Sequence, residues 1–427
     1  MGSRKLIPSD SEHDEERKQI RSRLSKSIRN DREQWWATKA KEMEKAAAIG
    51  NTRQLYRLIK ETGINKSSVS QTISEKDDTL ICSQSRRLER WAGHFREQFS
   101  WPLATLQLPS IPRQCEWNIV VGPPTLAEVQ EAMVNLKRGR AAGPDGLAPE
   151  VFKDGGPILA IRFTNILAKI WELDVIPSDW SQSLIVPIYK RGSKSSCDNH
   201  RGISLTNIAS EILASIMIGR LTKTRELQTR ENQAGFRSGR GRIDQIVTIH
   251  QVLEHRHTYR RPTMMVFLDL EAAFDSVKRE VLWQCLSLNG VPQNYINLVK
   301  TLHSNTTSRV RAYGELSSAF ATLSVCQSCP LSPFLFNFII DLLMEITFSS
   351  TEFLGIDLLP GGPLIDLEYA DDIVLFGEDA DKMQSLLVAL SNNARMFGMR
   401  FSLSNCKLLL QDWYASTPEL RSSRTRC

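Results

Sequence analysis

Apolar residues recur along the chain with two periods, which predict an alternation of helices and strands. Intervals of three and four residues, the period of a helix, occur over 86–99, 125–136, 149–173, 207–227, 243–257, 279–289, 293–303, 332–346 and 381–397. Short apolar runs bounded by turn residues, typical of strands, occur at 183–190, at 263–270, on both sides of 314–315, at 364–377 and at 399–403. The mixture begins near residue 125 and predicts an α/β fold.

One strand and one hairpin of this pattern carry acidic residues. The run 263–270 is continuously apolar, as expected of a strand buried on both faces, and it contains Asp269 near its end. Apolar residues flank Asp371 and Asp372, which predicts two strands joined by a tight turn. Aspartate tolerates unusual turn dihedrals, so we expect the pair at or beside that turn. Adjacent carboxylates repel each other unless a cation neutralises them, although a bare acidic turn is usually only a solvated loop.

The composition of the chain changes near residue 120. We expect a helical basic extension and linker over 1–120, a mixed α/β domain over 121–410, and a polar, disordered tail over 411–427. Segment 11–48 is rich in helix-forming charged residues and has neither Gly nor Pro. A basic helix there could contact phosphates. We favour a solvated linker helix, because runs of charge are usually solvated faces.

The composition is that of a globular protein with a mild excess of positive charge. Hydrophobic residues make up 41% and charged residues 24% of the 427 residues, and the net charge is +6. This charge is consistent with a nucleic-acid partner. The N-terminus has no apolar signal segment, and charged or polar residues interrupt the longest apolar stretch, so we expect an intracellular protein without a membrane partner. The eight scattered cysteines are expected to be reduced thiols.

Short motifs follow one another in order between residues 141 and 407. They are AAGPDGLAPE at 141–150, IVPIYK at 185–190, NHRGISL at 199–205, QAGFR at 233–237, FLDLEAAFD at 267–275, QSCPLSP at 327–333, YADD at 369–372, FG at 397–398 and NCK at 405–407. This series resembles the reverse transcriptase domain of LINE-type (non-LTR) retrotransposons, with the RTE-like group as one candidate within that class. The resemblance covers roughly two thirds of the chain.

The resemblance implies a fold and an activity. The fold would be a right-hand polymerase with fingers and palm, in which helices back an antiparallel palm sheet, preceded by the helical extension. The activity would be RNA-directed DNA polymerisation, in which dNTPs are added to a DNA 3′-OH on an RNA template. The partners would be an RNA template, a DNA primer and dNTP, and the cofactors would be two Mg²⁺ ions, with Mn²⁺ as an alternative. Such proteins act on nuclear DNA after synthesis in the cytoplasm, so both compartments are expected.

The resemblance also assigns the residues that would hold the metal ions. Asp269, Asp371 and Asp372 would bind both ions, helped by the backbone carbonyl of Leu270. Lys407 would protonate the pyrophosphate leaving group, unless it is simply an exposed lysine at the end of a strand. Three carboxylates on adjacent strands can hold two divalent cations about 4 Å apart, the arrangement used for in-line phosphoryl transfer.

Five further residues would contact the substrates. Lys190 and Arg201 would hold the triphosphate, and Phe274 would lie under the sugar, where its ring would exclude a 2′-hydroxyl. Gln327 would contact the nucleotide near the nascent base pair. Arg237 would either touch a template phosphate or form a structural ion pair, and the sequence leaves both open.

One motif departs from the family pattern. The family has Gly-Val-Arg-Gln-Gly before its Ser-Pro pair, whereas this chain has Ser324, Cys326 and Ser328 in place of the two glycines and the arginine. A side chain at position 328 would crowd the path of the incoming nucleotide. The family's endonuclease and most of its thumb are also not recognisable. The alternative is therefore an inactive, truncated retrotransposon relic that at most binds nucleic acid. A metal-dependent nuclease fits less well, because Phe274 and Gln327 suit nucleotide selection.

Overall fold

The chain divides into two compact units, Met1–Ser68 and Val69–Cys427. The structure, a computed structural model, describes residues 14–61, 72–99, 111–322, 330–358, 362–402, 405–418, 420–422 and 425–426. Every described residue to which the sequence assigns chemistry, from Lys190 to Lys407, belongs to the second unit.

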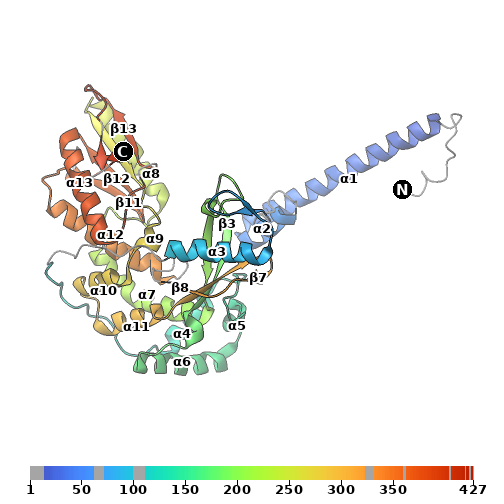
Figure 1. Ribbon diagram of the computed structural model, residues 1–427, viewed down its shortest axis with the longest axis horizontal. Coiled ribbons are helices and arrows are strands. Elements are labelled where there is room, and N and C mark those ends of the chain that lie inside the picture. Colours follow the sequence, from blue (N-terminus) through green and yellow to red (C-terminus); the bar gives the residue numbers. More distant parts are fainter. Residues whose placement is uncertain are drawn as a thin grey trace. The chain divides into compact units, whose positions relative to one another are not determined.

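The described part of the first unit is helical. It consists of α1 (Asp14–Ala48) and α2 (Thr52–Glu61), drawn in blue in Figure 1. α1 matches the helix expected over 11–48, from its first described residue onward. Trp35 and Trp36 are exposed on α1, and their rings meet edge to face with centroids 5.0 Å apart.

A four-stranded antiparallel sheet lies in the second unit. Its strands, in order, are β11 (Asp366–Tyr369), β12 (Asp372–Gly377), β5 (Thr263–Leu268) and β13 (Lys407–Gln411). β5 pairs with β12 on one side and with β13 on the other. Successive side chains of a strand point to opposite faces, and those of β5 enter two different core clusters, with Met264 and Val266 in one and Met265 in the other. Burial on both faces explains why this sequence is continuously apolar.

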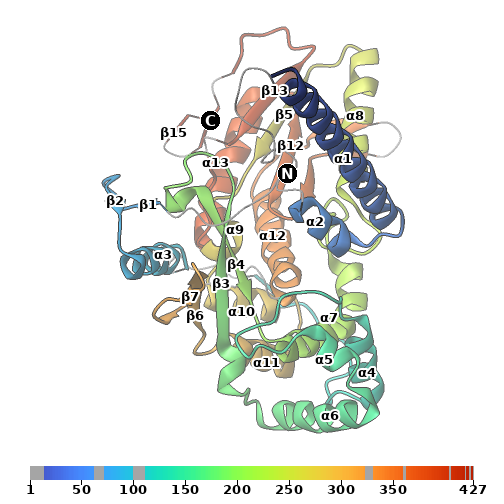
Figure 2. The ribbon, with the colours of Figure 1, turned by 90° about the vertical axis from the view of Figure 1, so that its right-hand side faces the viewer.

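Helices cover both faces of this sheet. α12 (Leu331–Ser349) and α13 (Ala380–Met396) share the core cluster of one face with α7 (Ile208–Gln228) and α10 (Arg279–Leu288). α8 (Arg242–Thr258) packs on the other face through Val252. Figure 2 shows α8 and α13 on opposite sides of β5 and β12. Among the described helices, α12 alone has the length and apolar composition of a membrane span, and 72% of that stretch is buried inside the protein.

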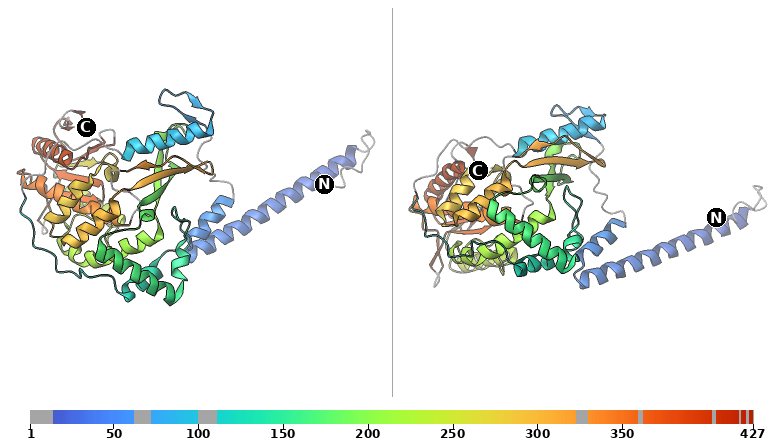
Figure 3. Two further views of the ribbon diagram at one scale, coloured as in Figure 1. Left: turned by 60° about the horizontal axis from the view of Figure 1, so that its bottom comes forward. Right: turned by 90° about the horizontal axis from the view of Figure 1, so that it is seen from below.

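A second sheet mixes parallel and antiparallel pairs. Its strands, in order, are β4 (His200–Leu205), β3 (Gln182–Tyr189), β6 (Thr307–Ala312) and β7 (Glu315–Leu316), and β8 (Phe320–Ala321) also pairs with β6. The pairing of β3 with β6 ends at Ile185. Pro187 therefore has a neighbouring strand only on its β4 side, as expected of a residue without a backbone N–H. α3 (Gln84–Phe99), the light blue helix of Figure 3, runs along this sheet. Its Trp91 and Phe95 share a core cluster with Ile185 of β3 and Val310 of β6.

Shorter elements connect or flank the two sheets. They are β1 (Ile73–Ser74), β2 (Leu80–Ile81), α4 (Leu126–Asn135), α5 (Pro149–Lys153), α6 (Gly156–Leu173), η3 (Ser178–Ser181), η4 (Cys197–Asn199), α9 (Ala273–Ser276), α11 (Gln293–His303), β9 (Ile356–Leu358), β10 (Gly362–Leu364), β14 (Arg421–Ser422) and β15 (Thr425–Arg426). The chain is thus a mixed helix-and-sheet protein, as the periodicity predicted.

Some segments differ from their expectation. The helix expected over 149–173 is interrupted before Gly156, which has a φ of 70° that glycine adopts readily. Trp117 lies in the expected linker but is buried in the main core. In the expected tail, Leu420 is buried in the same core, and β14 pairs with β15. α3 belongs to the second unit rather than to an extension that ends at residue 120. Apolar anchors thus tie these segments to the core.

Candidate active site

Asp269 follows β5 and lies between residues of the two neighbouring strands. The register that pairs Ile373 with Leu268 sets Asp372 opposite Asp269 when it is continued by one residue. On the other side, Asn405 Nδ2 donates a hydrogen bond of 2.8 Å to Asp269 Oδ2. Side chains opposite each other in a sheet are about 5 Å apart at Cβ. Asp372, Asp269 and Asn405 therefore form a row across one end of the sheet.

The hairpin that carries Asp371 turns through only two residues. Tyr369 pairs with Asp372, so that Ala370 and Asp371 form the turn. Ala370 has a φ of 60°, a left-handed conformation that costs a residue with a Cβ about 1–2 kcal/mol. As expected, the aspartates lie in and beside the turn, and the left-handed residue is Ala370. The strained residue therefore comes directly before Asp371.

The carboxyl groups at this edge share an unfavourable electrostatic environment. Burial raises the pKa of Asp371 above its usual value, the carboxylates of Asp372 and Asp269 raise it further, and Arg201 lowers it. Burial and the carboxylate of Asp269 also raise the pKa of Asp372, which Arg242 lowers. An excess of negative charge thus gathers where the two strands end.

The donor set at this edge fits a divalent cation. Asp269, Asp371 and Asp372 offer the oxygen ligands that Mg²⁺ and Mn²⁺ prefer, and a cation would relieve their mutual repulsion. Within the described ranges, no three Asp, Glu, His or Cys side chains converge closely enough to form a ready metal cage. Leu270, expected to add its carbonyl, forms an isolated bridge with Phe401.

The two basic residues expected to hold the triphosphate come from the second sheet. Lys190 follows β3 directly, Arg201 lies in β4, and both are exposed. Arg201 is near enough to Asp371 to lower the pKa of that carboxyl. Burial raises the pKa of Asp275 to about 6, and the positive charges of Arg201 and Lys190 act against this rise. The fold therefore brings Arg201 toward the acidic edge of the first sheet, and it brings Lys190 toward Asp275 of α9.

Phe274, the expected sugar contact, is a buried residue of α9. Its ring lies 4.5 Å from that of Phe336, centroid to centroid, and 6.2 Å from that of Phe236. Phe236 is half exposed, with a φ of 55°. The ring of Phe274 is thus fixed from the core side by Phe336 and lies beside the exposed Phe236.

The remaining predicted residues have different surroundings. Lys407 begins β13 opposite Phe267 and is exposed. Arg237 is buried, and it donates to Glu226 at 2.8 Å and to the carbonyl of Gln233 at 2.9 Å. These contacts favour the ion-pair interpretation of Arg237 over a phosphate contact. Gln327 lies outside the described residues, as do the three departures from the family motif.

Three side chains at the site were not assigned a role from the sequence. Asn405 and Gln233 belong to quoted motifs, but their partners lie more than a hundred residues away in the chain. Arg242 places its guanidinium 5.2 Å from the centre of the Tyr369 ring. A positive charge over an aromatic face is attractive, and Arg242 also lowers the pKa of Asp372. In the sequence, the signal for Arg242 is that it belongs to the arginine-rich stretch 237–242.

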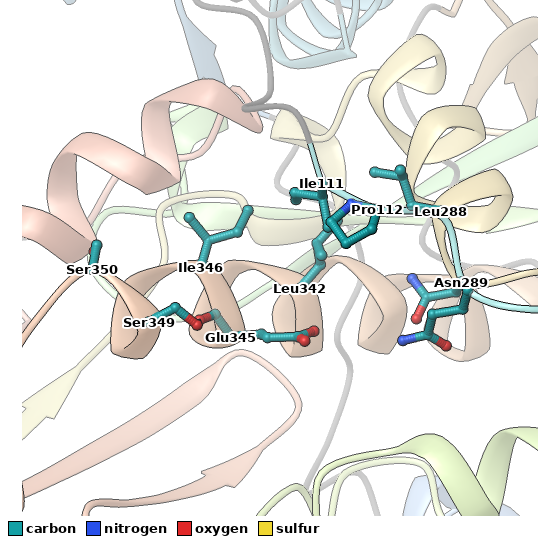
Figure 4. A pocket seen from close by; sticks show the side chains of 10 residues that line it. Ile111, Pro112, Leu288, Asn289, Leu342, Glu345, Ile346, Ser349 and Ser350 are labelled. Carbon is teal, nitrogen blue, oxygen red and sulfur yellow. The ribbon is translucent and has the colours of Figure 1, made fainter.

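A cavity lies elsewhere in the second unit. It has a volume of about 450 Å³ and lies between α12 and the segment near Ile111. Figure 4 shows Leu342, Ile346 and Leu288 around it, and Glu345 is the one ionisable side chain among the described residues that line it. None of the three aspartates lines this cavity, so it is separate from the acidic edge.

Comparisons with known proteins address the family of the chain. The reverse transcriptase (RNA-dependent DNA polymerase) family matches residues 188–422. The chain is 24% identical over 347 residues to the retrovirus-related Pol polyprotein from type-2 retrotransposable element R2DM of Drosophila melanogaster. The matched stretch covers 79% of the chain and 31% of that protein. It is 26% identical over 253 residues to the corresponding polyprotein from type-1 retrotransposable element R2 of Popillia japonica, with 58% and 35% covered. The probable RNA-directed DNA polymerase from transposon X-element of Drosophila melanogaster is 25% identical over 258 residues, with 58% and 28% covered.

These matches confirm the resemblance to LINE-type, non-LTR retrotransposons. The chain spans about a third of the length of these relatives. The matched region extends over more than half of the chain and includes every described candidate residue from Lys190 to Lys407. The chain belongs to the reverse transcriptase (RNA-dependent DNA polymerase) family.

Proposed function

We propose that this chain copies RNA into DNA, adding dNTPs to the 3′-OH of a DNA primer on an RNA template. The observation that carries the proposal is the meeting of opposite charges between two sheets. Asp269, Asp371 and Asp372 gather at one end of the first sheet, Arg201 approaches Asp371 from the second sheet, and Lys190 approaches Asp275 of α9. Acidic groups for cations beside basic groups for phosphates are what nucleotidyl transfer needs.

The two sheets would correspond to the palm and the fingers of a right-hand polymerase. The antiparallel sheet of β11, β12, β5 and β13 is the palm, with α12 and α13 behind it. The sheet of β3 and β4, with α3 packed on it, belongs to the fingers. The palm supplies rigid positions for the aspartates, whereas the fingers carry Lys190 and Arg201, the basic side chains that would meet the triphosphate.

The aspartates would hold two Mg²⁺ ions, with Mn²⁺ as the alternative. When bound, these cations lower the pKa of the primer hydroxyl and stabilise the pyrophosphate leaving group. Asp269, Asp371 and Asp372 would coordinate them, with the carbonyl of Leu270 as a further ligand. Lys190 and Arg201 would bind the phosphates by charge-assisted hydrogen bonds.

Selection and proton transfer would involve other residues. The hydroxyl oxygen of the primer attacks the α-phosphorus and its proton passes to solvent, while the bond from that phosphorus to the oxygen shared with the β-phosphorus breaks and releases pyrophosphate. Lys407, exposed beside the site on β13, would give a proton to the pyrophosphate. Phe274 would lie against the sugar, its ring fixed by Phe336, and Gln327 would contact the nucleotide near the nascent base pair.

A binding-only protein is the second candidate function. Ser324, Cys326 and Ser328 replace the glycines and the arginine of the family motif, and a side chain in place of glycine restricts how closely a nucleotide can approach. Such a protein would hold an RNA–DNA duplex through its basic residues without extending the primer.

Primer extension separates the two candidates. A DNA primer annealed to an RNA template is incubated with Mg²⁺ and dNTPs and with the wild-type chain or the Asp371→Ala/Asp372→Ala variant. The matched control is Asp77→Ala/Asp78→Ala, which removes two adjacent aspartates from the turn between β1 and β2. We expect extension by the wild type and by the control but none by the site variant. Duplex binding without extension by the wild type would exclude a polymerase and leave the binding-only candidate.

A further inference from the structure

A short segment between α7 and α8 covers the free edge of β11. Gln233 forms an isolated parallel bridge with Glu368. The N–H of Glu368 donates to the carbonyl of Asn232 at 3.0 Å, and the N–H of Ala234 donates to the carbonyl of Glu368 at 2.9 Å. The segment thus continues the sheet beyond β11, beside the strand that leads into the Ala370 turn.

The side chain of Gln233 reaches the turn itself. Its Oε1 accepts hydrogen bonds of 2.8 Å from the N–H groups of both Ala370 and Gly235. Its Nε2 donates to Glu368 Oε2 at 2.9 Å and lies 3.4 Å from the carbonyl oxygen of Ala370. Gln233 is 0% exposed. Both ends of the amide are therefore engaged, and all four contacts involve the turn, its strand or the segment of Gln233.

The chemistry of the partners fixes which way this amide points. Backbone N–H groups can only donate, so the atom that meets Ala370 N and Gly235 N must be the oxygen. The carboxylate of Glu368 and the carbonyl of Ala370 accept, so the atom that meets them must be the NH₂ group. A glutamine therefore suits this position, whereas a carboxylate would oppose one oxygen to Glu368.

Three further features hold the segment and the strand before the turn in place. A Cβ added to Gly235 would lie 2.2 Å from the nitrogen of Ala370, so only glycine permits this approach. Asn337 of α12 donates to the carbonyl of Gly235 at 2.7 Å. The other carboxylate oxygen of Glu368, Oε1, accepts a hydrogen bond from Arg230, which also donates to Asp366 at 2.8 Å.

We propose that Gln233 is a positioning residue that holds Ala370 in its left-handed conformation and thereby fixes the place of Asp371. A left-handed alanine is unfavourable by itself. The Oε1 of Gln233 binds the N–H of Ala370, and the Nε2 of Gln233 approaches the C=O of Ala370. The consequence for cation binding rests on the proposed function. The consequence for the backbone of the turn does not.

The test is a pair of substitutions that exchange the two side-chain groups. Gln233→Glu keeps an oxygen that accepts from Ala370 N, but it places a second carboxylate against that of Glu368. Adding Glu368→Gln to it restores a donor between the two side chains, leaves an oxygen for Arg230 and returns the net charge to that of the wild type. Gln245→Glu is the matched control, because Gln245 donates to the carbonyls of Asn232 and Glu368 but does not touch Ala370.

Amide hydrogen exchange of the peptide covering 367–373 is the first readout, and it needs no cation. We expect Gln233→Glu to exchange about tenfold faster than the wild type, the factor that a lost buried hydrogen bond produces. The exchanged pair should return to within about threefold of the wild type, and Gln245→Glu should stay within that range. The proposal would be overturned if Gln233→Glu left the exchange rate of this peptide unchanged. It would also be overturned if Gln245→Glu raised the rate as much as Gln233→Glu does. If Gln233→Glu does not fold, Gln233→Met, of similar length and without added charge, replaces it with the same expectation.

Binding of Mn²⁺, followed by the electron paramagnetic resonance of the free ion, is the second readout. We expect Gln233→Glu to weaken Mn²⁺ binding about tenfold and the exchanged pair to restore it. Altered exchange with unaltered Mn²⁺ affinity would show that Gln233 shapes the turn without positioning Asp371, which overturns the proposal. A wild-type chain that binds no Mn²⁺ overturns the proposed function, and hydrogen exchange then decides whether Gln233 holds the turn.

Discussion

Asp372 lies opposite Asp269 across β12 and β5, on the same side of the sheet. Alternation along the strands places Asp269 with Met265 and Phe267, and Asp372 with Val374 and Phe376, toward the core cluster that contains residues of α8. Two carboxylates in this relationship repel each other directly. The arrangement therefore stores an unfavourable interaction that a cation between the strands would remove.

Asp372→Asn should stabilise the cation-free protein while removing its activity. The folded state raises the pKa of Asp372, so ionisation of this group costs stability as the pH rises through the raised value, and a neutral amide avoids that cost. Because Asp372 is exposed to solvent, we expect a small rise in Tm at pH 7 without divalent cations, about 1–2 °C. Thermal unfolding in a chelating buffer measures it. A lower Tm would show that the carboxylate is stabilised by partners rather than opposed by Asp269.

Phe274→Val should separate core packing from sugar selection. Loss of ring contacts with Phe336 should lower the free energy of unfolding by roughly 2–3 kcal/mol. If the ring also excludes the 2′-hydroxyl, the preference for dNTP over the matching rNTP should fall by about tenfold or more. Single-nucleotide incorporation with each substrate gives the ratio. Lower stability with an unchanged ratio would leave Phe274 a core residue only.

Arg237→Gln should destabilise the fold without changing how nucleic-acid binding depends on salt. Arg237 is buried against Glu226 and two backbone carbonyls, and the loss of such a partner should cost roughly 2–3 kcal/mol. A phosphate contact would instead reduce the slope of log affinity against log salt by about one. Arg240→Gln, at an exposed site in the same segment, is the control. A reduced slope specific to Arg237→Gln would restore the template-contact interpretation.

The pH dependence of stability should change in Asp341→Asn. Burial raises the pKa of Asp341 on α12 to about 7, against the lowering effect of Arg225. A raised pKa in the folded state contributes stability below the ordinary value near 3.8 that is lost as the pH rises through about 7. The variant should therefore match the wild type near pH 4 and exceed it at pH 8, with a Tm difference of about 2–4 °C. Thermal unfolding from pH 4 to pH 8 measures the difference, and one that shrinks with pH would refute this assignment.

The sequence predicted the parts of the site that follow from local patterns. A continuous apolar run identified β5 and placed Asp269 after it, and the apolar flanks of Asp371 and Asp372 identified the hairpin. The pair lies in and beside the turn, as expected, but the left-handed conformation falls on Ala370, and alanine carries no local signal for it. Its cause is the contact with Gln233, which is 137 residues away in the chain.

Other features escaped prediction for the same reason. Asn405 acquires its role only because β13 pairs with β5, which places it beside Asp269. In the described part of the strand expected at 399–403, Phe401 forms an isolated bridge with Leu270, and β13 begins later, at Lys407. Leu420 has mostly polar neighbours in the chain, so its segment gives too weak a signal to predict that it returns to the core. Pairings between distant segments decide such features, and periodicity does not encode them.

The most direct test of the aspartate site is the single-turnover rate at which one dNTP is added to a DNA primer on an RNA template with saturating Mg²⁺. Asp269→Asn keeps the shape of the side chain and a possible partner for Asn405, so it should fold like the wild type. We expect its rate to fall at least about a thousandfold, since a carboxylate ligand lost from a two-metal site costs several kcal/mol of transition-state stabilisation. A folded Asp269→Asn variant that works within about tenfold of the wild-type rate would contradict the assignment of Asp269, Asp371 and Asp372 as the catalytic carboxylates.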